Sequence, residues 1–137
     1  MGRWIAASAA AAATVALAAC GGESSSGVAA CGDDAPDGAR VVVEEPRSGE
    51  EVSSGFEVKG CSSTFEGNVR WRLRGRDGRV VASGFTQGGS LEAAVFEFEV
   101  NYEVEQRELA QLDVFESRVT EEGFPPPKDI VPLLLSP

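Results

Sequence analysis

The sequence predicts an all-β domain, folded as an antiparallel β-sandwich of about seven strands. Three observations indicate this class. From residue 40 onward, apolar and polar side chains alternate in short runs, as in strands that turn one face to a dry interior. Glycine, proline, serine and aspartate separate these runs, and no stretch keeps a helical apolar stripe for three turns. The 137-residue chain suits one such domain, which we place at residues 40–137.

Seven runs are expected to form the strands: residues 40–44, 56–59, 68–76, 79–83, 94–102, 109–115 and 130–135. The first is valine-rich and stops before Pro46. Asp77-Gly78 predicts a two-residue hairpin after the third, because both central residues of a type I′ turn need positive φ. Pro132 predicts that the last run is an edge strand or contains a bulge, since proline lacks a ladder donor.

A single set of alternate side chains is large enough to form one core between two packed sheets. The residues expected to point inward are Val41, Val43, Phe56, Val58, Val69, Trp71, Leu73, Phe96, Phe98, Val100, Leu112, Val114 and Ile130.

Residues 1–19 are expected to be a lipoprotein signal peptide. Arg3 is the only charged side chain before Glu23, and the Ala-rich apolar run that follows it is too short for a comfortable membrane span. Leu17-Ala18-Ala19-Cys20 resembles the bacterial lipobox, in which a diacylglyceryl group with acyl chains such as palmitate is attached to the cysteine. The alternative is an ordinary secretory peptide that happens to contain a cysteine.

Lipidation of Cys20 would anchor the protein to the bacterial cell membrane on its extracytoplasmic side. Residues 20–39, which begin with a Gly- and Ser-rich stretch, are expected to be a flexible tether between this anchor and the domain. The acids at Asp33, Asp34 and Asp37 lack the ligand spacing of a calcium loop, so we expect no metal site there.

Cys31 and Cys61 remain once Cys20 carries the lipid. An even pair in an oxidising compartment predicts a disulfide that closes a loop of about 30 residues. The alternative is two free thiols.

The charge pattern contains one local exception. The formal net charge of −10 argues against nucleic acid as a partner. Yet Arg70, Arg72, Arg74 and Arg76 occupy alternate positions of the third expected strand and should share its outer face.

Two interpretations of these arginines stay open. In the first, they form a solvated face, partly paired with Asp113 on the neighbouring strand and with residues near it such as Gln111 or Glu116. In the second, they form a stripe that binds an envelope polyanion, such as anionic lipid headgroups or cell-wall polymers. The expected hairpin would place Arg76 opposite Arg79, Arg74 opposite Val81 and Arg72 opposite Ser83, so this partner strand contributes no acids.

The sequence contains no histidine and no phosphate-binding Gly-rich loop followed by lysine. We therefore expect no catalytic residues and no cofactor. A carboxylate-based cell-wall glycosidase is the one enzymatic alternative, but the glutamates are scattered over turns and outward strand faces.

Several stretches occur in a recognisable order: FEGNVRWRL at 65–73, DGRVVASG at 77–84, and VFES at 114–117. Together with VEEP at 43–46 and FEVKG at 56–60, they resemble the immunoglobulin-like domain of bacterial spore germination proteins. The likeness covers roughly residues 40–135. It implies an extracytoplasmic immunoglobulin-like sandwich, often found in lipoproteins, and it supplies no catalytic residues. One departure is residues 118–128, which replace a usually short turn.

These observations favour a non-enzymatic, lipid-anchored binding or assembly module of the bacterial envelope, in contact with an anionic envelope component or an envelope protein. The alternative is a purely structural accessory lipoprotein that stabilises an envelope complex.

Overall fold

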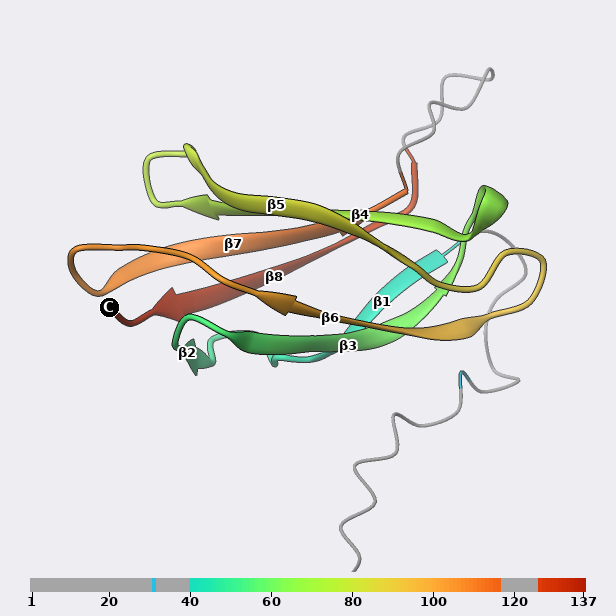
Figure 1. Cartoon of the computed structure of the whole chain (residues 1–137), viewed down its shortest axis with the longest axis horizontal. Helices are drawn as coiled ribbons and strands as arrows, with labels where there is room; N and C mark the ends of the chain where they lie inside the picture. Colours follow the sequence, from blue (N-terminus) through green and yellow to red (C-terminus); the bar gives the residue numbers. More distant parts are fainter. Residues whose placement is uncertain (1–30, 32–39, 117–125) are drawn as a thin grey trace, which may run out of the picture.

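The computed structural model describes residues 31, 40–116 and 126–137. Two sheets pack face to face, as expected (Figure 1). Their eight strands are β1 (Arg40–Glu45), β2 (Glu51–Val52), β3 (Phe56–Ser63), β4 (Asn68–Gly75), β5 (Val80–Gln87), β6 (Ala94–Val100), β7 (Glu108–Phe115) and β8 (Lys128–Leu135). A 3-10 turn, η1 (Phe65–Gly67), precedes β4.

The smaller sheet has the strand order β1-β3-β6 and the larger has the order β2-β8-β7-β4-β5. All neighbours are antiparallel except β2 and β8, which run parallel over two residues each. β2 is the strand that the sequence did not predict, and it is the shortest of the eight.

The core forms where the inward residues of the two sheets meet. Twelve of the thirteen predicted inward side chains are buried or pack against the buried cluster, so the alternation assigned the faces of five strands correctly. Trp71 of β4 is 8% exposed and stacks on Phe98 of β6, with ring centroids 5.0 Å apart. This contact joins β4, an interior strand of the larger sheet, to β6, an edge strand of the smaller one.

Ile130 is the inward residue that was predicted wrongly. It is 41% exposed and lies opposite Asp113 on the outer face, whereas Val131, Leu133 and Leu135 enter the core. Apolar residues occupy both faces of β8, so its sequence pattern does not show which face is buried.

The β4–β5 hairpin also differs from the prediction. Gly78 N donates to Gly75 O, and Gly75 N donates to Arg79 O, both at 2.9 Å, so the loop has three residues, and only Gly78 has a positive φ, at 81°. Arg74 therefore lies opposite Val80 instead of Val81, after a register shift beside Leu73, while Arg72 lies opposite Ser83 as expected.

Pro132 lies in a strand that has neighbours on both sides, but β2 covers only the end of it. Gly49 N donates to Pro132 O at 2.8 Å, and Leu134 N donates to Glu50 O at 2.9 Å. Since the backbone groups of alternate residues point the same way, the missing Pro132 donor lies on the β2 side and removes nothing from the ladder with β7.

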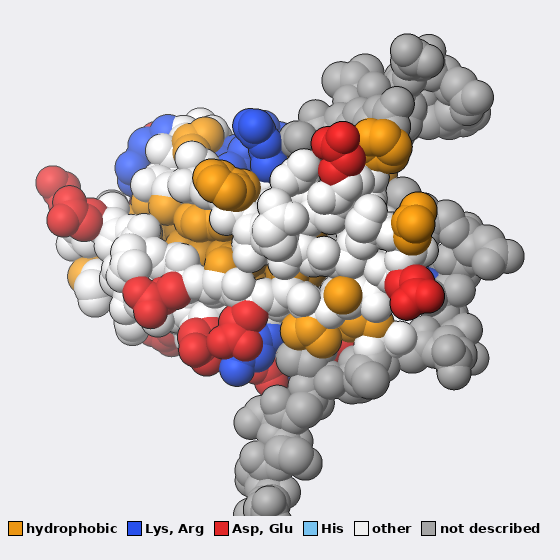
Figure 2. Space-filling view, turned by 45° about the vertical axis from the view of Figure 1, so that its right-hand side comes forward, with side chains coloured by type: hydrophobic (Ala, Val, Ile, Leu, Met, Phe, Trp, Pro, Cys, Tyr) orange, Lys and Arg blue, Asp and Glu red, His pale blue; other side chains and the backbone are white. Residues whose placement is uncertain are grey.

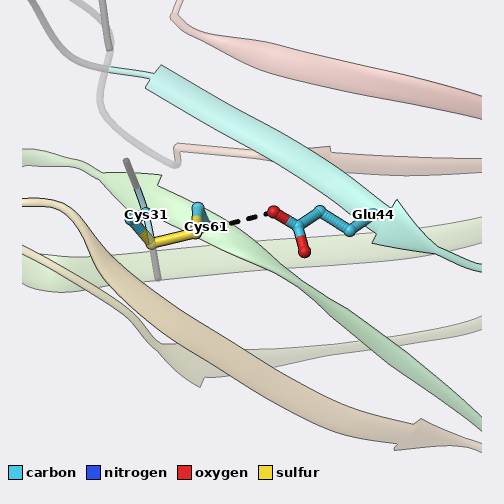
Figure 3. Close-up of a disulfide and its surroundings, with 3 residues drawn as sticks. All are labelled: Cys31, Glu44 and Cys61. Carbon is cyan, nitrogen blue, oxygen red and sulfur yellow. Dashed lines mark hydrogen bonds between the residues drawn. A yellow bond between two sulfur atoms is a disulfide. The ribbon is translucent and has the colours of Figure 1, made fainter. Parts of the chain in front are cut away.

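The predicted disulfide between Cys31 and Cys61 is present, with the Cα atoms 5.6 Å apart (Figure 3). Cys61 lies in β3 opposite Val42 of β1 and Val95 of β6, which are both exposed, so the bridge sits on the outer face of the smaller sheet. Its sulfur lies 4.0 Å from Glu44 Oε1. A disulfide sulfur has no hydrogen to donate, so we read this approach as a packing contact.

Replacing both cysteines with serine is expected to lower the free energy of unfolding by about 3–4 kcal/mol, the chain-entropy value for a loop of this size. Urea denaturation of the oxidised protein and of the double variant measures the difference. Reduced and alkylated wild-type protein controls for the serine side chains. An equal midpoint for oxidised and reduced wild-type protein would contradict the expectation.

Candidate functional site

The outer face of the larger sheet, which we call the cationic face, is the candidate site. On β5, β4, β7 and β8, four cations and one carboxylate point outward, for a formal charge of +3 in a chain of net −10, while Glu51 of β2 lies on the same face at the far edge of the sheet. Two rows cross β5, β4, β7 and β8 in that order: Phe85, Arg70, Phe115 and Lys128, and then Ser83, Arg72, Asp113 and Ile130. Arg74 follows Arg72 along β4.

Asp113 fixes two of the arginines. Its side chain is 3% exposed, and its Oδ2 lies 2.8 Å from both Arg72 Nε and Arg74 Nη2, while Gln111 Nε2 donates to Oδ1 at 2.6 Å. Burial alone would raise the pKa of Asp113, but hydrogen bonds from Gln111, Arg72 and Arg74 together outweigh it and hold this pKa below its ordinary value. Arg72 and Arg74 therefore follow the solvated, paired interpretation.

Arg72 also makes an aromatic contact. The carbon of its guanidinium lies 5.1 Å from the centroid of the Phe115 ring, within the range of a cation–π interaction. Its guanidinium is thus held by a carboxylate and by an aromatic ring, and its position on the face is well defined.

Arg70 is different. It is exposed, it lies between Phe85 and Phe115 in its row, and it has no ion-pair partner within residues 40–116 and 126–137. Arg76 likewise lacks a partner in this part of the chain, but it lies in the hairpin turn beyond the end of β4 and does not extend the row. Of the four arginines predicted to form a stripe, three therefore lie along the outer face of β4. Among these three, Arg70 is the one without an ion-pair partner in the described residues.

A shallow depression of about 340 Å³ opens beside Arg70. Arg70, Arg72, Ser83, Phe85 and Phe115 contribute to its lining. Phe85 is 76% exposed, so its ring is an uncovered apolar wall next to a free guanidinium. This combination suits a ligand that has an anionic group next to an apolar or flat surface.

The opposite outer face is acidic. Glu45, Glu57, Glu97 and Glu99 are exposed around Lys59 on the smaller sheet. A hydrogen bond with Glu57 is the main cause that raises the pKa of Lys59, and the charges of Glu57, Glu97 and Glu45 raise it further. Figure 2 shows most of the blue side chains along the top of the view, over the larger sheet, and most of the red ones lower down.

Sequence reasoning missed three members of the candidate site: Phe85, Phe115 and Lys128. They belong to strands whose alternation was read correctly or in part, but their position beside Arg70 follows only from the register between strands. The one available signal was the aromatic residue in an otherwise small and polar run at 80–87.

The other predicted sites have separate outcomes. Cys20 lies outside the described residues. Within the described part of the chain, no group of three or more Cys, Asp or Glu side chains could hold a metal ion, and no helix is long and apolar enough to cross a bilayer. Glu116, expected near the arginines, is instead buried, and its Oε1 accepts a hydrogen bond from Phe65 N at 2.6 Å.

Asp113→Asn is expected to destabilise the fold by about 2 kcal/mol at pH 7, because charge-assisted hydrogen bonds to Arg72 and Arg74 are lost. A lowered folded-state pKa contributes stability above the ordinary aspartate pKa, and this contribution is lost as the pH falls through the folded value. The gap between wild type and variant should therefore narrow below about pH 4.

Chemical denaturation over a pH series measures this gap, with the exposed Glu105→Gln as the matched carboxylate-to-amide control. A gap that widened with acid would show that the sign is wrong.

Comparisons with known proteins place the chain in a family. A search of curated proteins finds no match. Among solved structures, the chain is similar to the crystal structure of CopC from Methylosinus trichosporium OB3b, with 12% sequence identity, coverage of 73% of this chain and 95% of that chain, and a TM-score of 0.46. That similarity is too low to indicate a shared activity.

The family model for the immunoglobulin-like domain of bacterial spore germination matches residues 40–121, which is more than half of the chain and most of the sandwich. The resemblance noted in the sequence is thereby confirmed. The disulfide between Cys31 and Cys61 adds the chemistry of an oxidising compartment, which indicates a location outside the cytoplasm. The chain belongs to the family of immunoglobulin-like domains of bacterial spore germination.

Proposed function

We propose that this protein is a non-enzymatic binding module, lipid-anchored at Cys20, whose cationic face binds an anionic component of the bacterial cell envelope. The lipobox and the disulfide support a place at the outer side of a membrane. Membership of an immunoglobulin-like family supports binding over catalysis.

The observation that carries the proposal is the guanidinium of Arg70, which has no ion-pair partner in the described part of the chain and lies among the outward side chains of β5, β4, β7 and β8, which have a formal charge of +3. Arg72 and Arg74 are paired with Asp113, whereas Arg70 lies beside the exposed ring of Phe85 and lines the depression. The exposed acids of the smaller sheet are on the opposite face of the sandwich and do not neutralise Arg70.

These contacts give the cations of the face two different roles. Arg72 and Arg74 are held by Asp113 and keep the face positive and ordered, while Arg70 and Lys128 remain available to an anionic group. Both lie in one row across the sheet, with Phe115 between them. Neighbouring strands are about 4.8 Å apart, so the two cations are separated by roughly 10 Å, a span that two anionic groups of a polymer or of neighbouring headgroups can bridge.

The charge-removing double variant Arg70→Gln with Lys128→Gln is expected to weaken binding at least tenfold, because each contact of a charged donor with an anion contributes about 1.5–3 kcal/mol. The readout is co-sedimentation of the non-lipidated chain, residues 21–137, with purified cell wall in one arm and with anionic phospholipid vesicles in the other. Binding by the wild type should fall as salt rises.

Arg47→Gln with Arg107→Gln is the matched control, since it removes two exposed cations that lie outside the two rows that contain Arg70, Arg72 and Lys128. Equal binding by the two double variants, with both folded by circular dichroism, would reject the proposed site. No binding of the wild type in either arm would instead favour the structural accessory alternative. The arm that binds identifies the source of the anion.

Cys20→Ser is expected to move the full-length protein out of the membrane fraction, because the acyl chains supply about 0.8 kcal/mol for each buried methylene. Cell fractionation and intact mass of the membrane-extracted wild type test this. A wild-type mass without an added diacylglyceryl group would contradict the anchor.

A further inference from the structure

β5 is an exposed edge of the larger sheet, and its one protective feature is the register shift at Val81, near its start. It is the last strand in the order β2-β8-β7-β4-β5, and its sequence VVASGFTQ contains no charged residue and no proline. Edge strands are commonly guarded by lysine, proline, bulges or very short length, because their free backbone groups can pair with another chain.

The other three edges of the described sheets carry such protection. β1 has two glutamates and a register shift between Val43 and Glu45, followed directly by Pro46. β2 has only two residues. β6 carries Glu97 and Glu99, and its Glu97 O already accepts a hydrogen bond from Thr86 Oγ1 at 3.2 Å.

The backbone of β5 identifies which groups are free. Gly88 N donates to Gly67 O at 2.8 Å, so Gly88 directs its backbone groups toward the β4 side. By alternation Gly84 does the same, while Ser83 and Phe85 direct their N–H and C=O groups to the open edge. No backbone hydrogen bond from another described segment reaches these two residues.

The side chains at this edge are also uncovered. Phe85 is 76% exposed and Val80 is 55% exposed, and Ser83 is exposed between them. A strand laid along β5 would pair the free backbone groups and cover part of the Phe85 ring in the same step.

We propose that β5 pairs antiparallel with β5 of a second copy of this chain, which joins the two larger sheets into one continuous ten-stranded sheet. The uncharged composition argues for this partner, since each β5 then meets an edge of the same kind and no charge is buried. A two-fold axis perpendicular to the sheet relates the copies, which gives the closed symmetry most common among oligomers.

This symmetry also fits the distribution of charge and attachment. It keeps both cationic faces on one side of the joined sheet, and both smaller sheets with their Cys31–Cys61 bridges on the other. If both copies are anchored at Cys20 as proposed above, the two points at which the disulfides fix the upstream chains therefore lie on the same side of the joined sheet. The nearest β4 arginines of the two copies are three strand spacings apart, about 14 Å, which exceeds the Debye length of about 8 Å at physiological salt.

One paired edge buries less surface than a standard interface, so the dimer in solution is expected to be weak and dependent on concentration. Confinement of both copies to one membrane would raise their effective concentration.

Sedimentation velocity of the non-lipidated chain, residues 21–137, over a concentration series from micromolar to millimolar tests the proposal. The expected result is a monomer–dimer equilibrium that Phe85→Lys weakens at least tenfold. Val95→Lys, which adds the same charge at an exposed strand position of the smaller sheet, should leave the equilibrium unchanged. Ser83→Pro is a second variant, because it removes an edge-directed N–H and no donor of the β4 ladder.

Amide hydrogen exchange followed by NMR locates the contact. The Ser83 and Phe85 amides should exchange more slowly at high concentration than at low concentration. A monomer at every concentration, a dimer unaffected by both β5 variants, or equal exchange of these two amides would each overturn the proposal. Arg70→Gln with Lys128→Gln should dimerise normally, so failure of the pairing and failure of the anion site are distinguishable.

Discussion

The placement of Trp71 within β4, an interior strand of the larger sheet, is the constraint on which both faces of the protein depend. Its ring lies inward and stacks on Phe98, which brings β6 of the smaller sheet against β4 of the larger one. Gly84 of β5 makes room for it, since a Cβ there would lie 2.7 Å from the ring. Because side chains of a strand alternate, the same placement sends Arg70 and Arg72 outward. Core and candidate site are two consequences of one strand orientation.

The strands that sequence reasoning placed best are those with one clear apolar set. In β4, valine, tryptophan and leucine alternate with arginine, so only one face can be buried at low cost. In β8, Ile130 and Leu134 alternate with Val131, Leu133 and Leu135, and either face would satisfy a hydrophobic core. Contacts from outside the strand decide the matter, among them the hydrogen bond from Val43 N to Asp129 Oδ2. Such a long-range contact leaves no local pattern.

The candidate site was predictable in its charge and not in its composition. Four arginines at alternate positions predict a cationic face. The usual order of strands in an immunoglobulin-like sheet predicts that Asp113 lies on the neighbouring strand. That one carboxylate would hold Arg72 and Arg74 together, and leave Arg70 between two phenylalanines, depends on exact strand register. Arg76 shows the same limit, because one extra loop residue removes it from the strand.

The Cys31–Cys61 bridge also determines how the domain bears tension. Without it, a pull on the upstream chain would enter at Arg40, the first residue of β1, which is hydrogen-bonded to a single neighbour strand. With it, the force enters at Cys61 in β3, which is held between β1 and β6. The load then bypasses the weakest seam of the smaller sheet and is shared by two ladders at once. If the protein is anchored and bound as proposed, this path of force would oppose the separation of β1 from the smaller sheet.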